Sequence, residues 1–233
     1  MKKFLVACLF ITNVCSAEEK KPFNSFQATK KALEKIYNDN PDSRKTFYCG
    51  CSFDENKNIG SCPEPIKLSD EKRSKRLEWE HVVPASQLGK YFNKNIICET
   101  EKSKGRACLI KKSSKFREMH NDLYNLQPEV GKINALRSDK QYAIIRTENL
   151  IMGCDFEVMG DYVEPRKEIR GDIARTYFYM RGEYPEYVRL KRSFVEMLRL
   201  WTVEDPVSDE ECFRAKKIFA IQGNKNPFLW ICY

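Results

Sequence analysis

Eight cysteines constrain this chain of 233 residues more than any other feature, because paired thiols tie distant segments of a fold together. The sequence holds ten cysteines, and two of them fall in an N-terminal stretch with the pattern of an export signal. An even number of cysteines in an exported protein predicts up to four disulfides, here among Cys49, Cys51, Cys62, Cys98, Cys108, Cys154, Cys212 and Cys232. Eight cysteines allow on the order of 100 pairings. Spacing therefore favours only two local pairs, Cys98 with Cys108 and then Cys51 with Cys62.

Residues 1–17 have the parts of a signal peptide. Lys2 and Lys3 form its positive region, an apolar stretch follows, and Cys15-Ser16-Ala17 offers small residues for cleavage. The alternative of a lipid attached to Cys15 is weaker, because the three residues before it match such a site poorly. The apolar stretch is too short to span a bilayer, and no later run is long enough. We expect residues 18–233 to form one exported domain, in the periplasm or secreted, without a membrane partner.

The charge balance of the chain is basic. Lys and Arg number 41 against 33 Asp and Glu, which gives a net charge of +8. Loss of residues 1–17 removes two lysines and no acid and lowers the net charge by two. An exported chain with this excess favours a polyanionic partner, either nucleic acid or an anionic surface. Ordinary solubility is the alternative explanation.

The stretch from residue 77 to residue 86, LEWEHVVPAS, concentrates chemically active side chains. It places Glu78, Glu80 and His81 next to a β-prone pair of valines, and Pro84 then lacks the N–H that a strand needs. An imidazole near its neutral pKa serves as a general base, and carboxylate oxygens are hard ligands for a divalent cation. The alternative is an exposed polar strand end.

A second strand and a helix are predicted shortly before residue 140. Residues 122–128 alternate polar and apolar side chains and end at a proline, and residues 129–137 begin a helix with Asn134 on its surface. This hairpin-plus-helix unit would gather Glu80, His81 and Asn134. Because consecutive strand residues point to opposite faces, a twist or bulge is expected where Glu80 and His81 meet one site.

The rest of the chain has the pattern of a helical scaffold. Apolar residues at helical spacing predict helices over residues 26–37, 172–180 and 189–202, and a capping box at Ser208 and Glu211 begins another. Together with the hairpin, these elements predict an α+β fold: a single disulfide-linked domain with a mostly helical scaffold.

Eight further segments complete one pattern with the cysteine positions: TFYCGC (46–51), EWEHVVPA (78–85), GRAC (105–108), FREM (116–119), DLYNLQP (122–128), INALRS (133–138), IARTYFYM (173–180) and QGNKNPF (222–228). This pattern resembles the bacterial endonuclease I family of periplasmic or secreted nonspecific nucleases, which belongs to the ββα-metal (His-Me finger) class. The resemblance covers nearly all of residues 18–233, and all eight cysteines there fall where the family has them. It implies a ββα-metal core inside the helical scaffold.

The resemblance also implies four roles and a reaction. His81 would be the general base that takes a proton from the attacking water, and Arg106 would stabilise charge on the scissile phosphate. Glu80 and Asn134 would be the protein ligands of one Mg²⁺, with Mn²⁺ and Ca²⁺ as alternative ions. The implied protein is a monomeric Mg²⁺-dependent endodeoxyribonuclease that binds DNA through its phosphates, without sequence preference, and leaves 5′-phosphate ends. RNA stays open as a second substrate.

Four other residues are weaker candidates. Asn125 is expected to orient the hairpin or His81, and Glu78 is expected either to support the metal ligands or to form an ion pair. Arg137 and Arg175 are candidates for phosphate contact, with structural ion pairs as the equally weighted alternative.

The chain departs from the family pattern at five positions near the site: His120, Tyr124, Lys132, Ala135 and Leu136. These departures make a rival hypothesis worth testing, an exported cationic nucleic-acid-binding protein with an impaired catalytic site. His120 is expected to be structural. A zinc hydrolase is disfavoured, because two histidines cannot supply the usual zinc ligands without cysteines.

Overall fold

The described residues form two small β-sheets. In the first, β1 (Leu77–His81) pairs antiparallel with β2 (Leu126–Val130), and the second has the strand order β3 (Gln141–Tyr142), β5 (Tyr162–Pro165), β4 (Phe156–Met159). The computed structural model describes residues 22–100, 102–145 and 150–233, so the predicted signal peptide lies outside the described residues. The mixture of sheets and helices confirms the predicted α+β class.

Helices surround these sheets. The α-helices are α1 (Phe26–Asn38), α2 (Ala85–Leu88), α3 (Lys94–Ile97), α4 (Gly105–Lys112), α5 (Ser114–His120), α6 (Gly131–Arg137), α7 (Arg170–Glu183), α8 (Arg192–Glu204) and α9 (Asp209–Gln222). Short 3₁₀ helices are η1 (Pro41–Ser43), η2 (Leu123–Asn125), η3 (Lys167–Ile169) and η4 (Pro227–Cys232). Across the described ranges, none of these helices combines the length and the apolar character needed to cross a membrane.

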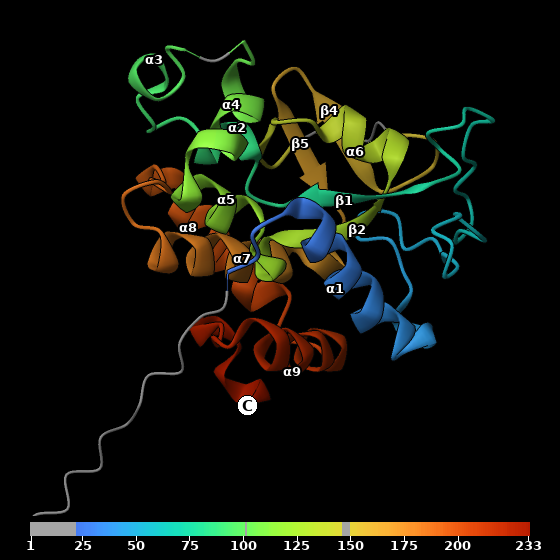
Figure 1. Cartoon of the computed structure of the whole chain (residues 1–233). Helices are drawn as coiled ribbons and strands as arrows, with labels where there is room; N and C mark the ends of the chain where they lie inside the picture. Colours follow the sequence, from blue (N-terminus) through green and yellow to red (C-terminus); the bar gives the residue numbers. More distant parts are fainter. Residues whose placement is uncertain (1–21, 101, 146–149) are drawn as a thin grey trace, which may run out of the picture.

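Strands β1 and β2 and helix α6 pack together as a central unit, although α2 to α5 lie between the two strands in the chain. Figure 1 shows the two strands near the middle, with α6 and the β4–β5 strands on one side and α1 on the other. The predicted second strand starts four residues too early, because residues 123–125 form η2 and the strand begins at Leu126. Pro128 lies inside β2 rather than at its end. It is tolerated there because β2 is an edge strand at this point, where the Pro128 carbonyl accepts the Phe47 N–H at 2.8 Å.

The scaffold helices largely follow the sequence pattern. Helix α1 buries Leu33 and Ile36, as its apolar spacing predicts. The capping box at Ser208 and Glu211 is present at the start of α9, and Gly223 ends that helix with a φ of 87°, a conformation that favours glycine.

Four disulfides staple the fold. Both predicted local pairs, Cys98–Cys108 and Cys51–Cys62, are confirmed. The other two disulfides, Cys49–Cys154 and Cys212–Cys232, could not be selected from the spacing of the cysteines. The Cys49–Cys154 bond links positions 105 residues apart, and the Cys212–Cys232 bond ties the C-terminal η4 to α9. The Cys49–Cys154 disulfide lies next to Tyr48, whose hydroxyl donates to Glu80 at 2.9 Å.

Candidate active site

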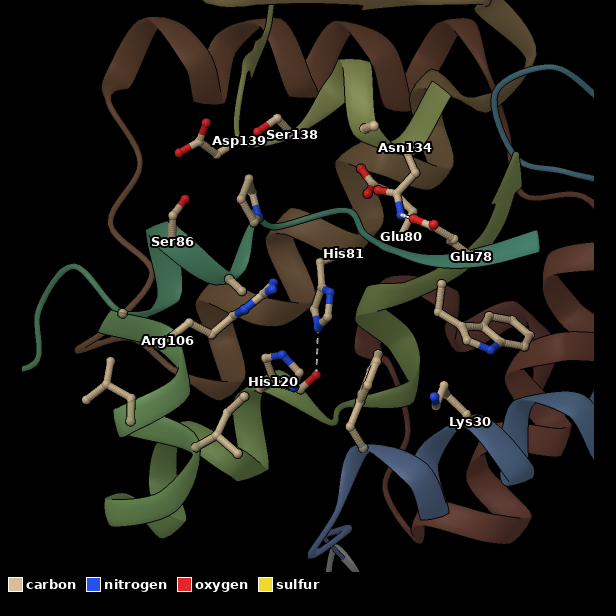
Figure 2. A pocket seen from close by; sticks show the side chains of 18 of the residues that line it. Lys30, Glu78, Glu80, His81, Ser86, Arg106, His120, Asn134, Ser138 and Asp139 are labelled. Atoms are coloured by element: carbon tan, nitrogen blue, oxygen red, sulfur yellow. Dashed lines mark hydrogen bonds between the residues drawn. The ribbon is translucent and has the colours of Figure 1, made fainter. Parts of the chain in front are cut away.

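Strand β1 sends its side chains alternately to two sides of the sheet. Its pairing with β2 is one-to-one along both strands, which the structure describes in full, so the bulge, one of the two alternatives expected there, does not occur. Figure 2 shows Glu78 and Glu80 on the side of Asn134. His81 points the other way, toward His120. His81 nevertheless lines the same pocket of about 840 Å³ as Glu80.

The hydrogen bond of His81 fixes which ring nitrogen carries its proton. Nε2 lies 2.8 Å from the backbone carbonyl oxygen of His120, drawn as a dashed line in Figure 2. A carbonyl oxygen only accepts, so Nε2 must carry the hydrogen and the neutral ring keeps its lone pair on Nδ1. Burial lowers the pKa of His81 well below its usual range, and the neighbouring His120 and Arg106 add to that effect. His81 is therefore a neutral imidazole at pH 7, as a general base requires.

Phe26 and His120 enclose the ring of His81. The Phe26 ring stacks on His81 with centroids 5.6 Å apart, and the His120 ring lies 4.4 Å away. Asn121 donates its Nδ2 to the Phe23 carbonyl at 2.9 Å, so its Oδ1 accepts from His120 Nδ1 at 3.1 Å. His120 thus positions His81 with its carbonyl and its ring, which agrees with its expected structural part. Phe26 was not predicted, because a ring in the first turn of a distant helix carries no local sign of this contact.

Arg106 lies in the first turn of α4, which the Cys98–Cys108 disulfide ties down two residues later. The side chain is exposed and lines the pocket, and in Figure 2 it extends toward His81 and His120. It lowers the pKa of both histidines, after the larger effect of burial. A guanidinium in this place is suited to an anion bound beside His81.

Glu80 and Arg137 form a buried ion pair. Arg137 donates from Nη1 to Glu80 Oε1 at 2.6 Å and to the His81 carbonyl at 2.5 Å, and from Nη2 to the Val82 carbonyl at 2.6 Å. Tyr48 also donates to Glu80 Oε1, at 2.9 Å. Burial raises the pKa of Glu80, and the charge of Arg137 opposes that rise. Tyr48 was not predicted as part of the site.

The two candidate phosphate arginines are structural ion pairs instead. Arg137 has a fully buried guanidinium that clamps the end of β1 to α6, so no phosphate reaches it. Arg175 bridges Asp172 at 2.9 Å and Glu211 at 2.5 Å, and thereby joins α7 to α9. In both cases opposite charges in the core outcompete a solvent-facing orientation. Of the two alternatives expected for Arg137 and Arg175, the structure shows the structural ion pair.

Asn125 fixes the chain just after β1. Its Oδ1 accepts the Val83 N–H at 2.7 Å, and its Nδ2 donates to the Val83 carbonyl at 3.0 Å. The Asn125 carbonyl also accepts the Val82 N–H at 3.0 Å. Asn125 is fully buried and acts on the hairpin, which matches one of the two alternatives expected for it.

Glu78 and Asn134 are directly bonded. Asn134 donates its Nδ2 to Glu78 Oε2 at 3.0 Å, while Arg73 and Arg76 approach the same carboxylate. Burial alone would raise the pKa of Glu78, but hydrogen bonds from the two arginines outweigh it and lower the pKa. Glu78 is therefore an ionised carboxylate between β1 and α6.

The oxygen atoms on this side of β1 fit a hard cation. Glu80 accepts both of its side-chain hydrogen bonds on Oε1, and Oε2 takes part in neither. Asn134 uses its Nδ2 on Glu78, so Oδ1 is the free end of the amide. One carboxylate and one amide oxygen suit Mg²⁺, which keeps several waters when it binds protein. Within the described ranges, no three His, Cys, Asp or Glu side chains form a metal-binding group, and the eight cysteines there are disulfide-bonded.

These features define an α+β protein, held by disulfides, whose pocket combines a neutral imidazole, an arginine, and carboxylate and amide oxygens. Hydrolysis of a phosphate ester needs such a set. The family model for endonuclease I matches residues 12–230. The chain belongs to the endonuclease I family.

Curated relatives agree with this membership. An endonuclease-1 of Buchnera aphidicola (subsp. Acyrthosiphon pisum) is 36% identical, over 96% of this chain and 88% of that protein. An extracellular deoxyribonuclease of Aeromonas hydrophila is 33% identical, over 88% of each chain. A periplasmic deoxyribonuclease of the same species is 32% identical, over 88% of this chain and 85% of that protein.

Proposed function

We propose that the chain is an exported, metal-dependent endonuclease that hydrolyses phosphodiester bonds of DNA without sequence preference. Residues 1–17 are the signal peptide, residues 18–233 are the nuclease domain, and β1, β2 and α6 are its ββα-metal core. The relatives named as periplasmic and extracellular deoxyribonucleases support both the substrate and the export. The observation that carries the proposal is the His81 tautomer, which leaves the lone pair of the ring on Nδ1, in a residue that lines the same pocket as Arg106.

The proposed reaction uses this chain's residues at three points. His81 takes a proton at Nδ1 from a water molecule, whose oxygen then attacks the phosphorus. Arg106 donates hydrogen bonds to a non-bridging phosphate oxygen as negative charge develops there. Mg²⁺, when bound, supplies positive charge beside the phosphate and the departing oxygen. Glu80 and Asn134 would hold it.

Bond cleavage on the 3′-oxygen side of the phosphorus sets the products. The bond from phosphorus to the 3′-oxygen breaks, the 3′-oxygen leaves and takes a proton from solvent water, and the phosphate stays on the 5′ side. The family departures do not alter the atoms used in these steps. Lys132, for example, pairs with Glu71 at 2.7 Å on the surface.

The ends of nicked DNA test the reaction class. Supercoiled plasmid nicked by the oxidised protein with Mg²⁺ should be resealed by DNA ligase without prior kinase treatment, because a 5′-phosphate faces a 3′-hydroxyl. EDTA should abolish nicking. Nicks that ligase seals only after kinase treatment would contradict the proposed bond. Salt-sensitive binding without any cleavage would favour the rival, a nucleic-acid-binding protein with an impaired site.

A further inference from the structure

The carboxylate of Glu78 uses all of its hydrogen-bonding capacity. Oε1 accepts from Arg73 Nε at 2.9 Å and from Arg76 Nη2 at 2.8 Å. Oε2 accepts from Arg73 Nη2 at 2.7 Å and from Asn134 Nδ2 at 3.0 Å. An ionised carboxylate offers about four lone-pair positions. Glu78 therefore has no position left for a cation, although it lies two residues from Glu80 on the same face of β1.

This saturation fixes the orientation of the Asn134 amide. An ionised carboxylate only accepts hydrogen bonds, so the amide atom that faces Glu78 must be the NH₂ group. Oδ1 is then the end of the amide that remains for a cation. Without Glu78, the amide could rotate by half a turn and present its NH₂ group, which repels a cation.

The local packing holds Glu78 in this position. Helix α6 begins at Gly131, where an added Cβ would lie 2.7 Å from the Arg73 carbonyl oxygen and 3.0 Å from Glu78 Cδ. Only glycine allows α6 to approach the Arg73–Glu78 pair this closely. The first turn of α6, which leads to Asn134, is thus packed directly against the group that orients it.

We propose that Glu78, held by Arg73 and Arg76, is a positioning residue that directs Oδ1 of Asn134 toward the divalent cation. The inference rests on the proposed function, in which Asn134 is a metal ligand. Glu78 acts through Asn134 and does not touch the cation itself. Groups that orient metal ligands commonly change metal affinity by about 10–100-fold when they are removed.

The test is the affinity of the oxidised mature protein for Mn²⁺, measured by isothermal titration calorimetry without nucleic acid. Glu78→Gln should bind Mn²⁺ about 10–100-fold more weakly than wild type. The matched control is Glu71→Gln, which removes the same charge from the ion pair with Lys132 in α6. It should bind Mn²⁺ as wild type does. Thermal melting of each variant checks that the fold is intact.

A second background separates orientation from simple attraction. Asn134→Asp carries an oxygen at both ends of the side chain and needs no orientation. Glu78→Gln should therefore not weaken Mn²⁺ binding in the Asn134→Asp background. If Glu78 only attracted the cation by its charge, the loss would be similar in both backgrounds. Should Glu78→Gln fail to fold, Arg73→Gln loosens the same carboxylate and should weaken binding in the same conditional way.

The outcomes separate this inference from the proposed function. The positioning role of Glu78 would be overturned if Glu78→Gln weakened Mn²⁺ binding equally in wild-type protein and in Asn134→Asp, or if it did not weaken binding in wild-type protein. Asn134 would remain a ligand in both cases. Wild-type protein that does not bind Mn²⁺, or unchanged affinity in Asn134→Ala, would overturn the ligand role of Asn134 and the positioning role with it.

Discussion

Replacing His81 with alanine is expected to slow DNA cleavage by about 10²–10⁴-fold, because the attacking water then loses its general base. DNA binding should be retained, since binding depends on phosphate contacts from other residues. Cleavage is measured as the rate of plasmid nicking, and binding as the fluorescence anisotropy of a short duplex in EDTA.

Added imidazole serves as the control for His81→Ala. The substitution leaves a space beneath the Phe26 ring, which stacks on His81 in the native protein. A free imidazole in that space should restore part of the nicking rate if His81 is a base. A substitution that merely disturbed the packing would not respond to imidazole. Cleavage by His81→Ala at the wild-type rate would remove His81 from the mechanism.

Arg137→Met is expected to lower the free energy of unfolding by about 3–5 kcal/mol, because it leaves the buried carboxylate of Glu80 without its charge partner. It also removes the donors that the His81 and Val82 carbonyls use. The free energy is measured by unfolding in urea with the disulfides intact. A loss within experimental error would mean that this pair does not stabilise the fold.

Two further variants are compared with Arg137→Met. Arg192→Met breaks an exposed pair with Glu196 and should leave the unfolding free energy unchanged within error. Adding Glu80→Gln to Arg137→Met should recover part of the lost stability, because no buried charge then remains unpaired. Recovery should be incomplete, since the two backbone carbonyls still lack their donors. Complete recovery would show that those carbonyl bonds contribute nothing.

The parts of the fold that follow from local sequence were predictable. The capping box at Ser208 and the buried face of α1 depend on residues within one or two turns, and both match the structure. The Cys98–Cys108 and Cys51–Cys62 bonds close short loops and were selected by spacing. The Cys49–Cys154 bond spans 105 residues, and its pairing depends on tertiary structure that no local pattern contains.

The same distinction between local sequence and tertiary structure applies to the residues of the candidate site. The sequence pattern assigns Glu80, His81 and Asn134 to two strands and a helix, and in the structure β1 pairs with β2, which leads into α6, although α2 to α5 lie between the two strands in the chain. Phe26 and Tyr48 enter from distant segments, and their contacts with His81 and Glu80 required the fold.

The sequence also did not predict that the side chain of Arg137 turns into the core. A basic residue at the end of a short helix is usually solvated, and here it turns into the core because Glu80 and two carbonyls face it. The start of the second strand was also predicted too early. Asp122 caps η2 by accepting the Tyr124 N–H at 3.1 Å, so the strand starts later than the alternating pattern suggests.

The most direct test of the central claim is the Mg²⁺ dependence of plasmid cleavage by wild-type protein and Glu80→Gln. Glutamine keeps an acceptor for Arg137 and Tyr48, and it removes the negative charge and the second oxygen that the cation would use. We predict nicking by the wild type that requires Mg²⁺, and no nicking by a folded Glu80→Gln protein at the same Mg²⁺ concentrations. Cleavage by Glu80→Gln with the wild-type rate and Mg²⁺ dependence would contradict a metal site at Glu80.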